Sequence, residues 1–133
     1  MAKTAKPNET RRSRRISRYR QAERGERPWG AWDVLAIGRG YVVKRLVIKP
    51  GQRISLQFHR HRSENWIIAD GKARVQIGDS VSIMRAGAGV QVPRRAVHRL
   101  ANAGRSPLVI IEVQRGTRLD EKDIVRLADD HGR

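Results

Sequence analysis

The chain has 133 residues with no cysteine, a hydrophobic fraction of 38% and a formal net charge of +16. This length suits one domain with a single small core, and the lack of cysteine excludes disulfides and thiolate metal sites. No apolar run approaches the roughly 20 residues needed to cross a bilayer, and no apolar signal segment is present. Composition therefore predicts a cytoplasmic protein without a membrane segment.

Residues 1–26 are predicted to form a flexible basic arm, and residues 27–133 a folded domain. Residues 1–27 carry ten Lys and Arg against three Glu, with few apolar side chains. Such a segment cannot bury enough surface to offset the entropy lost on ordering. The arm could contact nucleic acid or an anionic membrane through counterion release. A solvated tail is favoured instead, because Tyr19 is its one aromatic residue and offers no stacking platform.

Short runs rich in Val and Ile alternate with Gly, Pro and Asp turn signals from residue 41 onward. The runs cover residues 41–49, 54–59, 66–69, 73–77, 81–84, 90–92 and 108–113. This pattern predicts an all-β sandwich or barrel. In the tail, Ile124, Leu127 and Ala128 fall at helical spacing and Asp120 can serve as N-cap. The tail is therefore predicted to form one short C-terminal helix.

The stretch SLQFHRHRSENW, residues 55–66, combines a strand pattern with metal-ligand residue types. In a strand, Gln57, His59 and His61 share one face. Imidazoles and amides inside a barrel need partners, and a divalent metal is one, because imidazole and carboxylate bind Zn, Mn, Fe, Co and Ni. The alternative is a polar, partly wet pocket. A second segment, PRRAVHRLAN, supplies His98 after another tight turn and favours the metal.

The spacing of both segments resembles the two signature motifs of the cupin family. The first reads Gly51-x5-Gln57-x-His59-x4-Glu64-x6-Gly71, and the second reads Gly87-x5-Pro93-x4-His98-x3-Asn102. The resemblance implies a single cupin-type double-stranded β-helix, a jelly-roll barrel, with one divalent metal in its mouth. It assigns Gln57, His59, Glu64 and His98 as ligands of Zn, Mn, Co, Ni or Fe. A competing register would use His59 with His61, and it would place Trp66 where the glutamate belongs.

Two positions depart from the cupin motifs. Gln57 stands where most cupins have histidine, and Arg95 stands where the second motif usually has glycine. A turn that needs a positive φ at Arg95 would be altered by this change.

From about residue 27 to 133 the chain is also similar to the type II mannose-6-phosphate isomerases. The stretches RPWGAWDVL, VPRRAVHRLAN and IIEVQRGTRLDEKDIVRLADDHGR carry this resemblance together with residues 41–75. It implies interconversion of mannose 6-phosphate and fructose 6-phosphate, a phosphorylated sugar substrate and a homodimer, with residues 32–37 as a candidate dimer strand. That family often carries a mannose-1-phosphate guanylyltransferase half. No glycine-rich nucleotide loop is present here, so no GTP chemistry is expected.

Aldose–ketose exchange needs a base, a polarised oxygen and a phosphate anchor. Arg62 is a candidate to stabilise a developing oxyanion. Glu112 is a candidate base with His61 as its rival, and Gln114 shares the face of Glu112. Candidate cationic anchors are Lys44, Arg45, Lys49, Arg99, Arg126 and Arg133.

Several positions depart from the family, such as Asn65 and the terminal His131, and these leave the substrate open. Two alternatives therefore stand beside the isomerase. One is a metal-binding cupin that acts on another sugar or small molecule. The other is a non-catalytic binding or regulatory cupin whose arm docks to nucleic acid.

Overall fold

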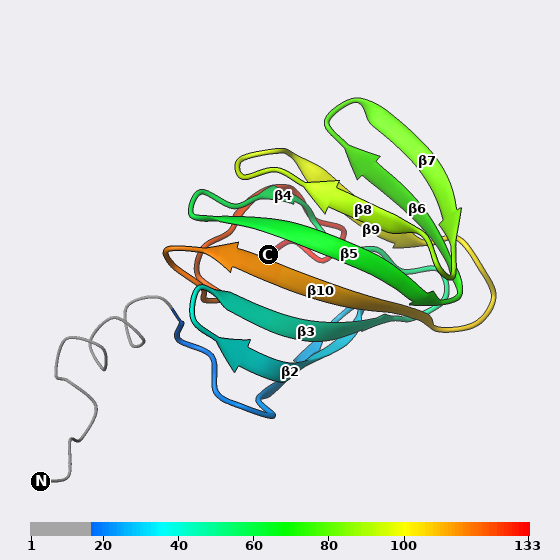
Figure 1. Cartoon of the computed structure of the whole chain (residues 1–133). Helices are drawn as coiled ribbons and strands as arrows, with labels where there is room; N and C mark the ends of the chain where they lie inside the picture. The colour runs from blue at the N-terminus through cyan, green and yellow to red at the C-terminus, as the bar shows by residue number, and fades with distance from the viewer. Residues whose placement is uncertain (1–16) are drawn as a thin grey trace, which may run out of the picture.

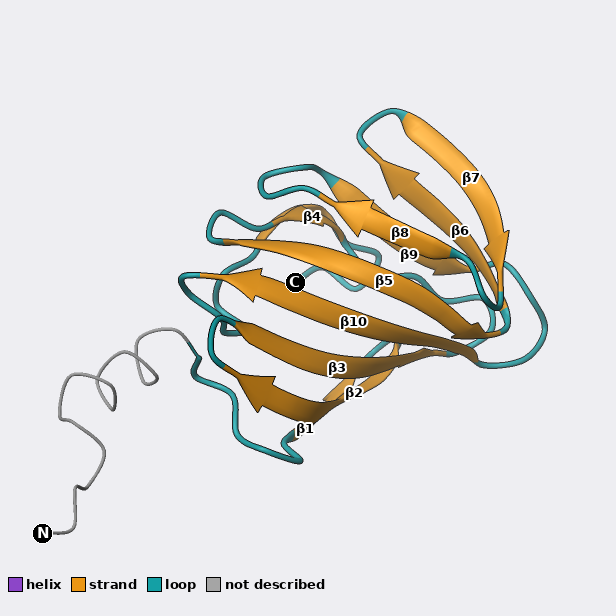
Figure 2. Ribbon diagram, viewed as in Figure 1, coloured by secondary structure: helices purple, strands orange, loops and turns teal. Residues whose placement is uncertain are grey.

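A computed structural model describes residues 17–133, which form two antiparallel β-sheets packed face to face (Figures 1 and 2). The strands are β1 (Arg24–Arg27), β2 (Gly30–Gly38), β3 (Tyr41–Ile48), β4 (Leu56–Phe58), β5 (Arg62–Asp70), β6 (Lys72–Ile77), β7 (Ser80–Arg85), β8 (Gly89–Val92), β9 (His98–Asn102), β10 (Leu108–Gly116) and β11 (Val125–Ala128). The predicted all-β barrel is confirmed.

The two sheets have the orders β1-β2-β3-β10-β5-β8 and β11-β4-β9-β6-β7. Strand β10 pairs with β3 on one side and with β5 on the other, over nearly its whole length. In these three strands alternate residues point between the sheets, as the period of two requires. The inner face of β3, β5 and β10 therefore lines the interior of the barrel.

That inner face changes character along the strands. At one end the buried side chains are apolar: Leu46, Ile48, Ile68, Leu108 and Ile110. At the other end most of them are polar or charged, namely Lys44, Arg62, Glu64, Glu112 and Gln114, and the apolar Val42 and Trp66 lie among them. The apolar half closes the core through burial of hydrophobic surface. The polar half places five hydrogen-bonding or charged groups where water is largely excluded, which is the arrangement of a site.

The predicted C-terminal helix is wrong. Residues Val125–Ala128 form β11, which pairs antiparallel with β4, so that Arg126 lies opposite Gln57. So short a segment gains little from isolated helix formation, whereas pairing with the free edge of β4 satisfies its backbone groups. Leu127, which the helical pattern would bury, is 55% exposed. No helix among residues 17–133 is long and apolar enough to cross a membrane.

The segment that the sequence assigned to the basic arm lies only partly within the described residues, since residues 1–16 fall outside them. Residues 17–26 contact the barrel and include most of β1, which pairs with β2. Tyr19 is buried, packs edge-on against Trp32 with ring centroids 5.8 Å apart, and donates a hydrogen bond to Glu121. This part of the arm therefore covers one side of the barrel.

The predicted dimer strand, residues 32–37, belongs to β2 inside the six-stranded sheet. Trp32 and Asp33 pair with β1 as well as with β3, and the backbone of Val34 exchanges hydrogen bonds with Ala22 and Glu23. Most of this strand therefore has no free edge for a second copy. The homodimer and the cytoplasmic location stay predictions from the sequence.

Candidate metal centre

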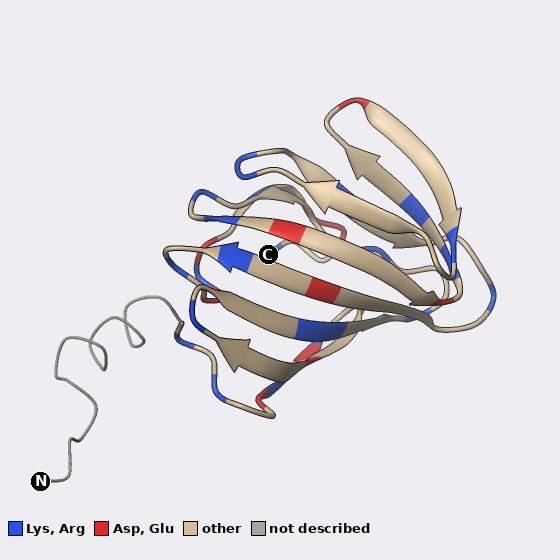
Figure 3. Ribbon diagram, viewed as in Figure 1, with Lys and Arg blue, Asp and Glu red and all other residues tan. Residues whose placement is uncertain are grey.

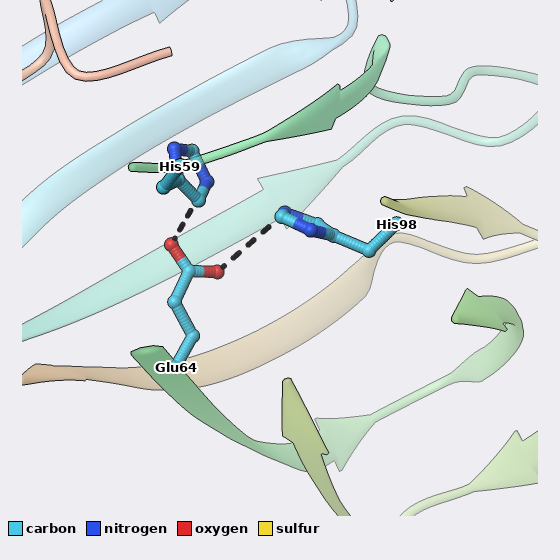
Figure 4. Close-up of side chains that lie close together, drawn as sticks. All are labelled: His59, Glu64 and His98. Atoms are coloured by element: carbon cyan, nitrogen blue, oxygen red, sulfur yellow. Dashed lines mark ion pairs between the residues drawn. The ribbon is translucent and has the colours of Figure 1, made fainter. Parts of the chain in front are cut away.

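Three strands of the barrel bring the predicted ligands together (Figure 4). His59 directly follows β4, Glu64 lies on β5 and His98 opens β9. The Glu64 carboxylate is 3.2 Å from Nε2 of His59 and 3.9 Å from Nε2 of His98. All three side chains are buried, and among residues 17–133 they form the one group of His, Asp and Glu able to hold a metal. The geometry favours the register that uses Glu64.

Both histidines turn the same ring nitrogen toward the centre. Nδ1 of His59 lies 2.6 Å from the carbonyl oxygen of Asp123, and Nδ1 of His98 lies 2.9 Å from that of Ala96. A carbonyl oxygen only accepts, so each Nδ1 carries hydrogen and donates it. Nε2 then keeps its lone pair for a metal. Burial lowers the pKa of His98, which keeps that imidazole neutral and suited to ligation.

Glu64 remains ionised inside the protein. Burial alone would raise the pKa of this carboxyl, but its contacts with His59 and with the Arg62 guanidinium hold the pKa well below its usual range. Arg62 Nε donates to one carboxylate oxygen at 2.9 Å, and Trp66 Nε1 donates to the other at 3.0 Å. An ionised carboxylate that is held in place beside two neutral imidazoles is a suitable ligand set for a divalent cation.

Gln57 completes the donor set. Its Nε2 lies 3.5 Å from Nε2 of both His59 and His98, and its Oε1 accepts a hydrogen bond from Ser55 at 2.6 Å. A half-turn of the amide exchanges its oxygen and nitrogen, and Ser55 can then accept instead of donate. The chain therefore offers two imidazoles, one carboxylate and one amide oxygen.

A cavity opens from this centre between the β1–β2 edge and the C-terminal segment. Besides ligand residues, its lining includes Arg27, Trp29, Trp32, Lys44, Arg62, Glu112, Glu121, Ile124, Arg126 and Arg133. Five of these side chains are cationic: Lys44 and Arg62 are buried, whereas Arg27, Arg126 and Arg133 are at least partly exposed to solvent. Arg133 pairs with Asp129 at 2.8 Å, and Lys44 and Arg27 both pair with Glu121, whereas no carboxylate among residues 17–133 lies within 4 Å of Arg126.

The structure divides the other predicted site residues into two groups. Lys44, Arg62, Glu112, Arg126 and Arg133 line the cavity. His61, Arg45, Lys49, Arg99 and Gln114 do not. Arg45 forms a two-pronged contact with Asp33 on the outside of the sheet, and Arg99 donates to the carbonyl oxygens of Ile54 and Ala128. Gln114 is fully buried and donates to Glu112 at 3.3 Å.

Glu112 is a second buried carboxyl beside the centre. Burial raises its pKa, the nearby Glu64 charge raises it further, and the two together bring it to about 8 against the opposing charge of Lys44. Glu112 therefore holds a proton near neutral pH while Glu64 does not. Two carboxyls with separated pKa values are the arrangement from which general acid–base pairs are built.

Three residues around the site were missed from the sequence. Arg27 was not among the candidate site residues, and Glu121 and Asp123 fell in the predicted helix. Asp123 accepts hydrogen bonds from the backbone N–H groups of Arg60 and His61, both at 3.0 Å, and so holds the loop that follows β4. The signal available was the acidic run at residues 120–123, which comes directly after the last long strand.

Two solved structures place the fold in the cupin class. The chain superposes on a Bacillus subtilis oxalate decarboxylase OxdC mutant with a TM-score of 0.69 and 23% identity, covering 79% of this chain and 30% of that one. An RmlC-like cupin from Shewanella frigidimarina gives a TM-score of 0.63 at 15% identity, covering 76% of this chain and 89% of that one. Likeness at this identity establishes the cupin fold.

The chain belongs to the family described as Mannose-6-phosphate isomerase C-terminal, whose model matches residues 14–129. Alginate biosynthesis protein AlgA of Pseudomonas aeruginosa is 47% identical over 107 residues, 80% of this chain and 22% of that protein. Xanthan biosynthesis protein XanB of Xanthomonas campestris is 43% identical over 126 residues, 89% of this chain and 27% of that protein. Mannose-1-phosphate guanylyltransferase ManC of Salmonella typhimurium is 43% identical, over 80% of this chain and 22% of that protein. The chain thus spans about a quarter of each of these relatives.

These relatives correct the predicted function. The sequence predicts a mannose-6-phosphate isomerase, but the relatives at 43–47% identity carry the names of a guanylyltransferase and of two polysaccharide biosynthesis proteins. The reason is physical: motif spacing fixes the barrel and its ligands, whereas the reaction depends on groups around them that the motifs do not specify.

Proposed function

We propose that this chain is a metal-binding cupin that takes a phosphorylated sugar into its barrel cavity. The observation that carries the proposal is the cavity itself, which is lined by His59 and Glu64 of the buried His59–Glu64–His98 group and by the cationic side chains of Arg27, Arg126 and Arg133. The names of the family and of ManC contain mannose 6-phosphate and mannose 1-phosphate. Mannose phosphates are therefore the first ligands to consider.

His59, Glu64, His98 and Gln57 would hold the metal ion. A bound divalent cation supplies a Lewis acid for sugar oxygens, with no need for a charged side chain at that point. Arg62 acts through Glu64, because its Nε and Nη1 donate to Glu64 and to the carbonyl oxygen of Asp120 at 2.9 and 3.0 Å. Arg62 is therefore a positioning residue in this proposal.

The phosphate would bind at the outer part of the cavity. Arg126 lies on β11 directly opposite Gln57, which brings its guanidinium near the metal ligands, and it has no carboxylate partner among residues 17–133. Guanidinium groups bind phosphate with two parallel hydrogen bonds. Arg133 and Arg27 stand on the same lining and would share the charge.

Glu112 would exchange a proton with a bound sugar. It lines the cavity, and its pKa of about 8 leaves it protonated at neutral pH, so it can donate to a sugar oxygen. An acid matched to the working pH is the most effective proton donor. The aromatic walls of Trp29 and Trp32 would exclude water from that exchange.

Calorimetric titration tests the proposal. Protein stripped with a chelator is titrated with Zn, Mn or Co, and the metal-loaded protein is then titrated with mannose 1-phosphate, mannose 6-phosphate and mannose. We expect one metal per chain and binding of a phosphorylated sugar but not of mannose. His98→Ala should abolish stoichiometric metal binding, whereas the exposed control His131→Ala should leave it unchanged.

An Arg126→Gln variant isolates the phosphate contact. It should weaken sugar-phosphate binding by about tenfold or more, because a charge-assisted contact is lost, and leave metal binding intact. Equal affinity for mannose and its phosphates would contradict the proposal, and so would a folded protein that binds no metal.

A further inference from the structure

Five exposed arginines lie together at one end of the barrel, outside the cavity. They are Arg39, Arg60, Arg94, Arg95 and Arg115. None of them lines the cavity, and none lies within 4 Å of a carboxylate of residues 17–133. We refer to these five residues as the arginine row. Figure 3 shows several blue segments, which mark Lys and Arg, in the loops at this end of the barrel.

The arginine row follows five adjacent strands. Arg39 joins β2 to β3, Arg115 lies near the end of β10, Arg60 precedes β5, and Arg94 and Arg95 follow β8. The sheet order β2-β3-β10-β5-β8 places these strand ends side by side. With neighbouring strands about 4.8 Å apart, the row extends over about 20 Å. It is therefore a line of positive charge rather than a single anion pocket.

Backbone hydrogen bonds fasten the loops that carry the row to one another. Gly116 N donates to Gly40 O at 3.3 Å, Thr117 N donates to His61 O at 3.3 Å, and Arg95 N donates to His59 O at 2.9 Å. At Gly116 any side chain would collide with the His61 carbonyl, so the close approach of these two loops requires glycine. The row is thus built on a continuous, fixed edge.

An exposed aromatic ring stands beside the row. Tyr41 is 40% exposed, and its Cα lies opposite that of Arg115. The ring lies against Gly38, where a side chain would collide with it. A tyrosine ring in that position offers a flat surface on which a base can stack.

We propose that the arginine row, with Tyr41, binds single-stranded nucleic acid. All five cations are arginines, whose planar forks match phosphate better than lysine does. A line of unpaired cations next to an aromatic ring is the combination with which proteins bind single strands without reading the sequence. This site is separate from the sugar-phosphate cavity, so it can be tested independently of the proposed function.

Fluorescence anisotropy with a labelled oligouridine of about 12 nucleotides tests the proposal on the full chain, within the usual site sizes. Each phosphate neutralised on a single strand contributes about −0.7 to the slope of log affinity against log salt. Five contacts therefore predict a slope of about −3.5. The triple variant Arg60→Gln, Arg94→Gln, Arg115→Gln should reduce it to about −1.4, which is about 100-fold weaker binding at 0.1 M KCl.

A matched triple separates the row from overall charge. Arg74, Arg85 and Arg105 are also exposed but lie outside the row, so their replacement by Gln changes the net charge equally. This control should bind RNA nearly as tightly as wild type. Tyr41→Ala should weaken binding about tenfold with the slope unchanged, because stacking is not a charge interaction.

Three outcomes would overturn the proposal. Equal losses in both triples would mean that net charge alone attracts the RNA. A full loss on replacing Arg11, Arg12, Arg14 and Arg15 by Gln, with none in the row variant, would move the contact to the N-terminal residues. Row-dependent binding of an acidic polysaccharide such as polygalacturonate, without binding of RNA, would assign a different partner. A circular dichroism spectrum and a thermal midpoint that match wild type check that the barrel is folded in every variant.

Discussion

Strands β3, β5 and β10 each serve two purposes along one inner face, and the two halves of that face follow different physical rules. In the apolar half, Ile110 of β10 lies between Leu46 and Ile68 and loses all contact with water. In the polar half, two residues further along β10, Glu112 lies between Lys44 and Trp66 and is nearly as buried. Burial of the apolar half stabilises the fold, whereas burial of the charged groups in the polar half costs part of that stability. We therefore expect mutations in the two halves to separate stability from ligand binding.

The largest loss of stability should come from the apolar half. Ile110→Ala removes three buried carbons at 0% exposure and leaves a cavity, so the free energy of unfolding should fall by about 4 kcal/mol. Metal affinity of the remaining folded protein should stay unchanged. Guanidinium denaturation and metal titration measure the two effects. The neighbour Ile111 points outward and is only half-buried, so Ile111→Ala should cost about 1 kcal/mol. Loss of metal affinity in Ile110→Ala would show that the halves are not separable.

Asp123→Ala should affect both stability and metal binding, because this residue braces the loop that carries His59. The carboxylate accepts two backbone hydrogen bonds, and their loss should cost about 3 kcal/mol. Metal affinity should fall about 10–100-fold, as it does when the support of a ligand is removed. Calorimetric metal titration at a temperature where the variant is folded measures this. Asp130, which pairs with Arg53 on the surface, is the control, and Asp130→Ala should change stability by less than about 1 kcal/mol and metal affinity not at all.

The buried proton of Glu112 should make the metal-free protein less stable as pH rises. The unfolded carboxyl releases its proton near pH 4.5, whereas the folded one retains it until about pH 8. Between these values the folded state binds more protons, so the free energy of unfolding falls by up to about 1.4 kcal/mol per pH unit. Glu112→Gln removes this pH dependence. The stability of the variant relative to wild type should therefore increase from pH 5 to pH 8. Urea titrations in a chelator test it, and parallel pH profiles for both proteins would contradict the buried proton.

Sequence patterns predicted the half of the site that depends on strand periodicity. Alternation places Gln57 and His59 on one face of a strand. Glu64 and His98 lie on β5 and β9, and they were assigned by the resemblance to the cupin motifs. The tail could not be predicted in this way. The pattern at Ile124 and Leu127 suits a helix, but β4 has a free edge that only the fold reveals, and pairing with it brings Arg126 to the cavity. Asp120 does bond to the N–H groups of Lys122 and Asp123 as an N-cap would, yet no helix follows.

Cationic residues were the least predictable part of the site. Arg45 and Lys44 are adjacent on β3 and equally basic, yet one faces Asp33 outside and the other faces Glu121 inside. Adjacent residues of a strand point to opposite faces, and only the folded barrel shows which face is enclosed. The composition of the chain therefore could not predict which of the two cations enters the cavity. Arg27 was out of reach for a similar reason, because its place beside the cavity depends on β1 pairing with β2.

The smallest predicted effect is a gain in stability, and it lies at the polar end. Arg95 has a φ of 69°, a left-handed conformation that costs a residue with a side chain about 1–2 kcal/mol. This is the position where the cupin motif usually has glycine, and the turn it forms is tied to His59 O through Arg95 N at 2.9 Å. Glycine removes that cost but adds about 0.5–1 kcal/mol of chain entropy, so Arg95→Gly should stabilise the protein by about 0.5–1 kcal/mol. Arg94→Gly loses the same charge without relieving a left-handed residue, and it should destabilise by a similar amount. Denaturant titrations measure the change in the free energy of unfolding for both variants. Changes of opposite sign would locate backbone strain in the functional half of the barrel, and changes of equal sign would show that the lost charge alone decides both.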